Sequence, residues 1–254
     1  MTRGTWARLT DRRALACALA LAGLSTCRAE SQDPPSAAAA HVLFIGNSLT
    51  YFNTLPELVV RLARDMGDST LSAEMVAHPS FSLADHWDEG SALDQLRLHK
   101  WTHVVLQQGP SALPESGALL LQWTERFAPP IRQSGAEPVL FMVWPDRARA
   151  GDMDAVRRHY RDAAAAVHGI FAPAGDAWTL AFADDPLAPL YGPDGFHPAL
   201  EGSYVAAAVL LGRLRGVDPR QLPGSIPGST LDEPRVRALQ RAAAAALARN
   251  PARP

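Results

Sequence analysis

From His41 onward, short apolar runs alternate with stretches of helical periodicity, and this alternation is the strongest constraint on the fold. Apolar runs joined by helical segments are typical of a parallel sheet, because each parallel connection needs a long crossover. The expected strands are residues 41–46, 71–77, 102–107, 138–143 and 169–171. The sequence therefore predicts the α/β class, with a mainly parallel five-stranded sheet in a three-layer α/β/α sandwich.

Helical periodicity is clearest directly after the first strand, where Gly67 is placed to end the helix. Apolar residues recur there every three or four positions. They are Leu55, Leu58, Val59, Leu62, Ala63 and Met66. Further helices are expected near residues 119–132, 153–168, 200–214 and 233–248, the last two alanine-rich and amphipathic. The Pro/Gly-rich residues 217–230 are expected to form a loop before an outer final helix, so we expect one domain.

The first 40 residues are expected to lie outside this fold. Basic residues precede an apolar run, residues 14–24, which suits the core of a secretory signal but is short for a bilayer. The run ends in LSTC at residues 24–27, which resembles a bacterial lipobox whose cysteine becomes the lipidated first residue. Plain secretion with cleavage near Ala29 is the alternative. We expect a signal peptide with a candidate lipobox at 1–27, a flexible linker at 28–40 and the folded domain at 41–254.

Charge and cysteine content exclude several functions. The formal net charge is -2, and the basic residues of the body are scattered, so nucleic acid is not an expected partner. Both cysteines, Cys17 and Cys27, precede the body, which therefore has no thiol for a disulfide, a cysteine-ligated metal or a cysteine nucleophile. We expect no cofactor.

The strongest local motif ends the first predicted strand. Residues 44–50 read FIGNSLT, so a buried-strand pattern breaks into Gly-Asn-Ser before an amphipathic helix. In open parallel sheets, ligands meet the carboxyl ends of the strands, so Ser48 lies where a catalytic group is expected. The alternative is a serine that only ends a strand or caps a turn.

A second motif lies near the other end of the chain. Residues 191–198 read YGPDGFHP and place Asp194 and His197 three residues apart before a helix. This spacing lets the carboxylate hold the imidazole in the tautomer and orientation that take a proton from a serine. A surface histidine in a turn is the alternative, but the two motifs together favour a Ser-His-Asp triad.

Together, Gly-Asn-Ser after the first strand and Asp-x-x-His before a late helix resemble the SGNH/GDSL hydrolases, over residues 44–207. Residues 172–178 (APAGDAW) and 202–208 (GSYVAAA) share the resemblance. It implies a flavodoxin-like fold and ester hydrolysis through a serine acyl-enzyme. By this resemblance Ser48 is the nucleophile and an oxyanion donor through its backbone N–H, His197 is the base and then the acid, and Asp194 orients His197.

The remaining oxyanion donors differ from the family pattern. Residues 78–83 (HPSFSL) lack the family's glycine after strand two, so we expect a backbone N–H between Ser80 and Ser82 to replace it. Residues 107–111 (QQGPS) lack the family's asparagine after strand three. A glutamine amide can donate to an oxyanion in its place, so Gln108 is favoured, with Gln107 and Ser111 behind it. The alternative is that both glutamines are ordinary strand-end residues.

Other suggestive residues are assigned ordinary roles. His78, Asp85 and His86 show no recognised metal-ligand spacing, so no metal is expected, and residues 85–87 are expected to border the pocket. Trp144 and Trp178 follow the fourth and fifth predicted strands and are expected to be packing residues.

The family resemblance and the expected signal peptide together predict an exported serine esterase. The expected substrate is a small-molecule or carbohydrate ester, for example of acetate. An acyltransferase with the same triad, or a non-catalytic flavodoxin-like binding protein, is the alternative, although the latter has no use for Asp194 and His197. The expected location is that of a bacterial lipoprotein, periplasmic or at the outer membrane and held only by a lipid on Cys27, or else secreted.

Overall fold

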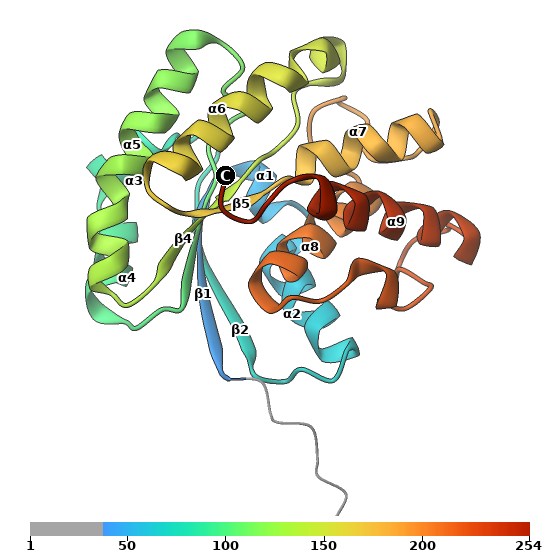
Figure 1. The fold of residues 1–254 in the computed structure, drawn as a ribbon, viewed down its shortest axis with the longest axis horizontal. Coiled ribbons are helices and arrows are strands. Elements are labelled where there is room, and N and C mark those ends of the chain that lie inside the picture. Colours follow the sequence, from blue (N-terminus) through green and yellow to red (C-terminus); the bar gives the residue numbers. More distant parts are fainter. Residues whose placement is uncertain (1–37) are drawn as a thin grey trace, which may run out of the picture. The chain divides into compact units, whose positions relative to one another are not determined.

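The computed structural model describes residues 38–254, so the expected signal peptide, Cys27 and most of the linker lie outside the described residues. Residues 38–254 form a five-stranded, all-parallel sheet with strand order β2-β1-β3-β4-β5 (Figure 1). The strands are β1 (Ala40–Gly46), β2 (Leu71–Ala77), β3 (His103–Leu106), β4 (Glu137–Phe141) and β5 (Ile170–Ala172). All five predicted strands are confirmed, and their ends agree within two residues.

Helices cover both faces of the sheet (Figure 1). One face carries α3 (Leu83–Glu89), α4 (Ser91–Leu98), α5 (Pro114–Gln133) and α6 (Met153–Ala166). The other carries α2 (Leu55–Asp65), α8 (Leu200–Arg215) and α9 (Glu233–Arg249), and α7 (Ala174–Asp184) packs on α8 and α9. Shorter elements are α1 (Ser48–Tyr51) and the 3₁₀ turns η1 (Phe52–Thr54), η2 (Arg147–Asp152) and η3 (Pro219–Gln221). The predicted three-layer α/β fold is confirmed.

Helix α8 differs from its predicted amphipathic character. Every residue from 202 to 211 is buried, because α2, α7 and α9 all pack against this helix. Helix α9 is the expected outer helix, and the 217–230 segment is a loop that contains η3. Three further helices, α3, α4 and α7, were not predicted. Within residues 38–254, no helix is long and apolar enough to cross a bilayer.

The parallel strands place the functional motifs at one edge of the sheet. Strands β1, β3 and β4 are the three interior strands, and their apolar residues are buried because helices cover both faces. Strand β1 ends at Gly46 and β3 ends at Leu106, so the segments that begin at Asn47 and Gln107 leave neighbouring strands at the same edge. The candidate site is built on this edge.

Candidate active site

Ser48 is the first residue of α1, directly after the turn that ends β1. Asn47 caps this helix, because its Oδ1 accepts the N–H of Leu49 at 3.2 Å. Ser48 is 9% exposed, and its Oγ makes no hydrogen bond within residues 38–254. Its backbone N–H belongs to the first turn of a helix, where N–H groups have no intrahelical acceptor. Among residues 38–254, therefore, neither the hydroxyl nor the N–H of this serine has a hydrogen-bond partner at the sheet edge.

Gln107 braces the turn that carries Ser48. This fully buried side chain accepts the N–H of Asn47 at 2.9 Å and the hydroxyl of Thr50 at 2.8 Å through Oε1. Its Nε2 donates to Asn47 Oδ1 at 2.9 Å and to the carbonyl of Gln108 at 2.5 Å. Both amide hydrogens are engaged, so Gln107 holds the serine turn in place. These contacts could not be predicted from sequence, because Gln107 and Asn47 are 60 positions apart.

Asp194 and His197 form a hydrogen-bonded pair on the loop before α8. His197 Nδ1 donates to Asp194 Oδ2 at 2.5 Å, while Asp194 Oδ1 accepts the N–H groups of Phe196 and His197, each at 3.0 Å. These bonds, first that from the His197 ring, lower the pKa of Asp194 to about 2. The carboxylate is therefore ionised at neutral pH and fixes the proton on Nδ1, which leaves Nε2 as the base.

Phe52 and Asn53 join the serine segment to the histidine loop. The Phe52 ring stacks on the His197 imidazole, with centroids 4.1 Å apart and planes 11° apart. Asn53 Nδ2 donates to the Pro198 carbonyl at 3.0 Å, a contact between residues 145 positions apart. Ser48 precedes Phe52 by four residues, about one helical turn, so this stacking brings His197 to the segment that carries Ser48. A direct Ser48–His197 hydrogen bond is not formed here, and such bonds often tighten only with substrate.

Asn53 has a left-handed backbone, with φ of 52°, a conformation that asparagine tolerates better than most residues. Thr54, which follows it, is also left-handed, with φ of 48°. Backbone strain of this kind persists where the surroundings enforce it, often at functional sites. Neither Phe52 nor Asn53 was identified from sequence, because their partners lie near the other end of the chain.

The two serines proposed after strand two differ in what their N–H groups bind. Ser80 has a positive φ of 62°, the backbone conformation that glycine adopts most easily, at the place of the family's glycine. Its N–H makes no hydrogen bond within residues 38–254. Ser82 instead caps α3, where its N–H and hydroxyl both donate to Asp85 Oδ2, at 2.8 and 2.7 Å. Ser80 is thus the freer donor of the two.

Gln108 is held within the loop after β3. Its Oε1 accepts the N–H of Leu83 at 3.2 Å, and its Nε2 donates to Ser111 Oγ at 3.1 Å and to the Ser116 carbonyl at 3.4 Å. The buried hydroxyl of Tyr160 donates to the Gln108 carbonyl at 2.6 Å. Gln108 can donate to an oxyanion only by exchanging one of these bonds, and the long bond to Ser116 is the weakest.

Trp144 and Trp178 pack beneath the loop that carries Asp194 and His197 and the start of α8. The two fully buried indoles stack 3.6 Å apart, which confirms the packing role expected for them. Trp144 donates to the Phe196 carbonyl at 3.1 Å, and Trp178 donates to the Gly202 carbonyl at 3.2 Å. The first of these bonds ties the loop of Asp194 and His197 to the core.

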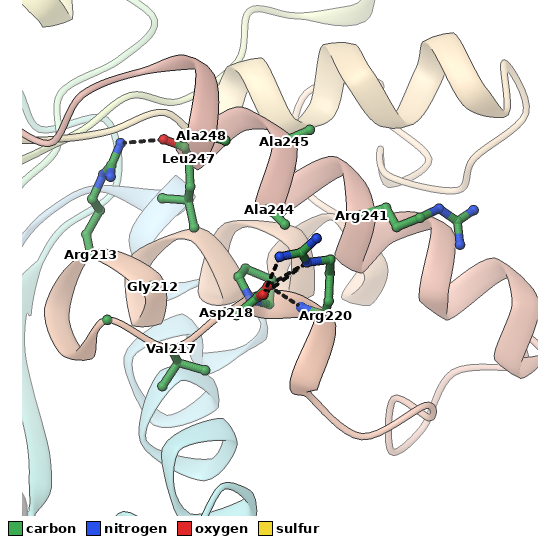
Figure 2. A pocket seen from close by; sticks show the side chains of 12 residues that line it. Gly212, Arg213, Val217, Asp218, Arg220, Arg241, Ala244, Ala245, Leu247 and Ala248 are labelled. Atoms are coloured by element: carbon green, nitrogen blue, oxygen red, sulfur yellow. Dashed lines mark hydrogen bonds and ion pairs between the residues drawn. The ribbon is translucent and has the colours of Figure 1, made fainter.

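Two cavities of the domain lie at different distances along the chain from Asp194 and His197. A cavity of about 220 Å³ lies beside the loop that carries Asp194 and His197, and Phe196 and Ser111 are among its lining residues. Another, of about 590 Å³, is bounded by α8, η3 and α9 (Figure 2). Figure 2 shows Arg220 paired with Asp218 and Arg213 bonded to the Leu247 carbonyl. Arg241 also lines this cavity and pairs with Asp184 at 3.5 Å. The first cavity is lined by Phe196, which neighbours His197 in the chain, whereas the second is lined by residues 212–220 and 241–248. Within residues 38–254, no cluster of three or more His, Cys, Asp or Glu side chains could hold a metal.

Comparison with solved structures places this fold among SGNH/GDSL hydrolases, esterases and lipases. A protein assigned to the SGNH hydrolases, from Slackia heliotrinireducens, is 27% identical with a TM-score of 0.59, over 68% of this chain and 97% of that one. A DUF4886 family protein from Bacteroides uniformis is 19% identical with a TM-score of 0.67, over 83% and 95% of the two chains.

An acetylxylan esterase from Geobacillus stearothermophilus, solved as a catalytic mutant, is 16% identical with a TM-score of 0.55, over 69% and 94%. No protein-family model matches the sequence, and no curated protein does. The structural neighbours confirm the resemblance that the Gly-Asn-Ser and Asp-x-x-His motifs indicated.

Proposed function

We propose that this chain, whose structural neighbours are SGNH/GDSL hydrolases, is a serine esterase that uses Ser48, His197 and Asp194. One observation carries the proposal: the imidazole of the Asp194–His197 pair stacks on Phe52, one turn after Ser48. The Ser48 hydroxyl has no hydrogen-bond partner in the described part of the chain. A flavodoxin-like binding protein would need neither the ionised Asp194 nor an oriented imidazole.

The proposed reaction follows from the positions of the protons. With Nδ1–H bound to Asp194, His197 Nε2 takes the Ser48 proton while Oγ attacks the ester carbonyl carbon. The oxyanion is stabilised by the Ser48 N–H, by the Ser80 N–H and by Gln108. The alcohol then leaves with the proton from His197, and the acyl group stays on Ser48. His197 next takes a proton from water as the water oxygen attacks the acyl carbon. The Ser48 ester bond breaks, Oγ regains the proton from His197 and the acid is released.

We propose that the cavity beside Phe196 receives the acyl group, although Ser48 and His197 are not among its lining residues. Its volume of about 220 Å³ is below the usual range of about 300–1,000 Å³ for sites that enclose a drug-sized ligand. Acetyl therefore suits this cavity better than a long chain. Two structural neighbours are described as acetyl xylan esterases, which agrees with an acetylated carbohydrate as substrate.

A substrate screen with triad variants tests the proposal. The probes are p-nitrophenyl esters of increasing chain length and acetylated sugars. We expect activity to fall as the acyl chain lengthens. Ser48→Ala and His197→Ala should each lower kcat by about 10³-fold or more, and the double variant should lose little further because the residues act as a unit. Multiplicative losses would contradict the triad. Product analysis with and without an acceptor alcohol separates hydrolysis from acyl transfer.

We also propose that the enzyme is exported and carries a lipid on Cys27. The basic start, the apolar run of signal length and the cysteine at its end support this proposal. The fold begins within the last three residues of the proposed linker: Arg215 donates to the Ala38 carbonyl at 2.8 Å, and β1 starts at Ala40. The linker would let the domain stand away from the membrane surface, whereas cleavage near Ala29 would release a secreted enzyme.

A further inference from the structure

His86 is a buried imidazole that the proposed reaction does not use. It lies on α3 and is 0% exposed, with its Nε2 2.8 Å from the carbonyl oxygen of Gly46. A carbonyl oxygen can only accept, so Nε2 must carry the hydrogen. Gly46 is the last residue of β1, two positions before Ser48. The imidazole therefore bonds to the strand end that carries the proposed nucleophile.

The other ring nitrogen of His86 has no partner within residues 38–254. Nδ1 is fully enclosed, and the rings of His78 and Phe81 lie 5.7 and 5.1 Å from the imidazole. Burial lowers the pKa of His86, which favours the neutral ring. A buried acceptor without a donor costs free energy, and phenylalanine would fill similar space without that cost. Packing alone therefore does not account for a histidine here.

His86 and Gln107 hold the two sides of one peptide group. The carbonyl of Gly46 and the N–H of Asn47 belong to the same planar unit. His86 donates to the carbonyl from α3 at 2.8 Å, and Gln107 accepts the N–H from the end of β3. The backbone N–H of His78 donates to the same carbonyl at a longer distance, 3.2 Å. A peptide group held at both its oxygen and its nitrogen cannot rotate freely, and its orientation sets the direction of the next residue, Ser48.

We propose that His86 is a positioning residue for Ser48, acting as a neutral imidazole that fixes the Gly46–Asn47 peptide group opposite Gln107. This inference rests on the proposed function, because it assigns His86 to the geometry of the nucleophile. The role depends on the hydrogen bond that His86 donates, which adds to the longer one from the His78 backbone N–H. A side chain that donates from the same place should replace His86, and a side chain of similar shape without a donor should not.

Two substitutions of His86 and one control test the role. His86→Phe removes the donor, and His86→Gln supplies an amide N–H at a similar reach. Thr124→Val is the control, since the Thr124 hydroxyl is also buried without a partner within residues 38–254 but lies on α5. We expect His86→Phe to lower kcat at least tenfold on a short ester with KM little changed, because small misplacements of reacting groups are costly. His86→Gln should restore most of kcat, and Thr124→Val should leave kcat unchanged.

Thermal unfolding of the same variants separates positioning from stability. If His86 has only a structural role, kcat should fall only in variants whose Tm also falls. If His86 positions Ser48, His86→Phe should lose kcat even when its Tm equals or exceeds that of the wild type. Nitrogen NMR of the whole protein gives a readout without substrate: the expected signal at pH 7 is a neutral His86 with its proton on Nε2. A proton on Nδ1, a charged ring, or a His86→Phe variant at wild-type kcat would overturn the inference. If Ser48→Ala kept full activity, the proposed function itself would fail, whatever the state of His86.

Discussion

At the scale of single residues, the charge on Asp194 decides which nitrogen of His197 carries the proton. The depressed pKa of about 2 means that the carboxylate stays ionised until strongly acidic pH. Its hydrogen bonds stabilise the fold above the carboxyl's ordinary pKa of 3.8, and this contribution is lost as pH falls through about 2. If kcat falls as the pH is lowered from 7 to about 4, protonation of a group other than Asp194 should therefore cause the fall.

Asp194→Asn should leave the fold intact and lower kcat by about 10³–10⁴-fold. The asparagine NH₂ facing Nδ1 would favour the tautomer with the proton on Nε2, which cannot accept from Ser48. Steady-state kinetics with circular dichroism would check this. An Asp194→Asn enzyme within tenfold of wild type would argue that another group orients His197.

Substitution of Gln108 tests how strongly a side chain after β3 stabilises the oxyanion. Gln108→Ala should lower kcat by roughly 10²-fold with little change in KM, because the bond forms mainly in the transition state. Ser111→Ala is the matched control, since it removes a partner of Gln108 Nε2 and leaves the amide free to donate. A Gln108→Ala enzyme at wild-type rate would shift the role to the backbone N–H groups of Ser48 and Ser80 or to other side chains of this loop.

Single-residue roles were only partly accessible from sequence. The roles of Ser48, Asp194 and His197 could be predicted because their motifs are local and lie beside predicted strands and helices. The contacts of Gln107, Phe52 and His86 could not be predicted, because each is made with a partner far along the chain. A buried glutamine that braces a turn looks the same in sequence as one that donates to substrate.

At the scale of elements, the junction of β1 and α1 depends on a glycine. A Cβ at Gly46 would lie 2.3 Å from Thr50 Oγ1 and 2.5 Å from Gln107 Oε1, both parts of the brace. Gly46→Ala should therefore destabilise the protein by about 1–3 kcal/mol through overpacking and lower kcat as well. Gly151→Ala, where a Cβ would meet nothing within 4 Å, should change neither. Urea unfolding and kinetics would measure both effects, and equal behaviour of the two variants would refute the role of this junction.

Helices were predicted correctly where the apolar periodicity extends over several turns. Helix α2 shows a clear apolar stripe, and α9 has a polar outer face, so both were found. Helices α3 and α4 have 7 and 8 residues, too few for periodicity to show. Helix α7 is buried from Ala174 to Trp178 and so has no polar face over its first half. Burial by neighbouring helices, which sequence does not show, also made α8 differ from its expected character.

At the scale of the whole molecule, the folded domain should act independently of its anchor. Cys27→Ser should release or mislocalise the protein without harming the domain, whereas Cys17→Ser, within the apolar run, should leave processing unchanged. A chain beginning at Ala37 should be soluble and fully active, because it keeps the Ala38 carbonyl that Arg215 binds. Mass spectrometry of the mature protein from its native host would decide. An unmodified amino terminus downstream of Cys27 would replace lipid anchoring with plain secretion.

The most direct test of the central claim is covalent labelling of the nucleophile. The wild-type enzyme would be treated with a serine-directed fluorophosphonate, and the adduct located by peptide mass spectrometry. We expect a single adduct on Ser48, no adduct in Ser48→Ala and much slower labelling in His197→Ala, because the imidazole must take the serine proton. Labelling of another residue, or of Ser48→Ala at the wild-type rate, would contradict the assignment of Ser48 as the catalytic nucleophile.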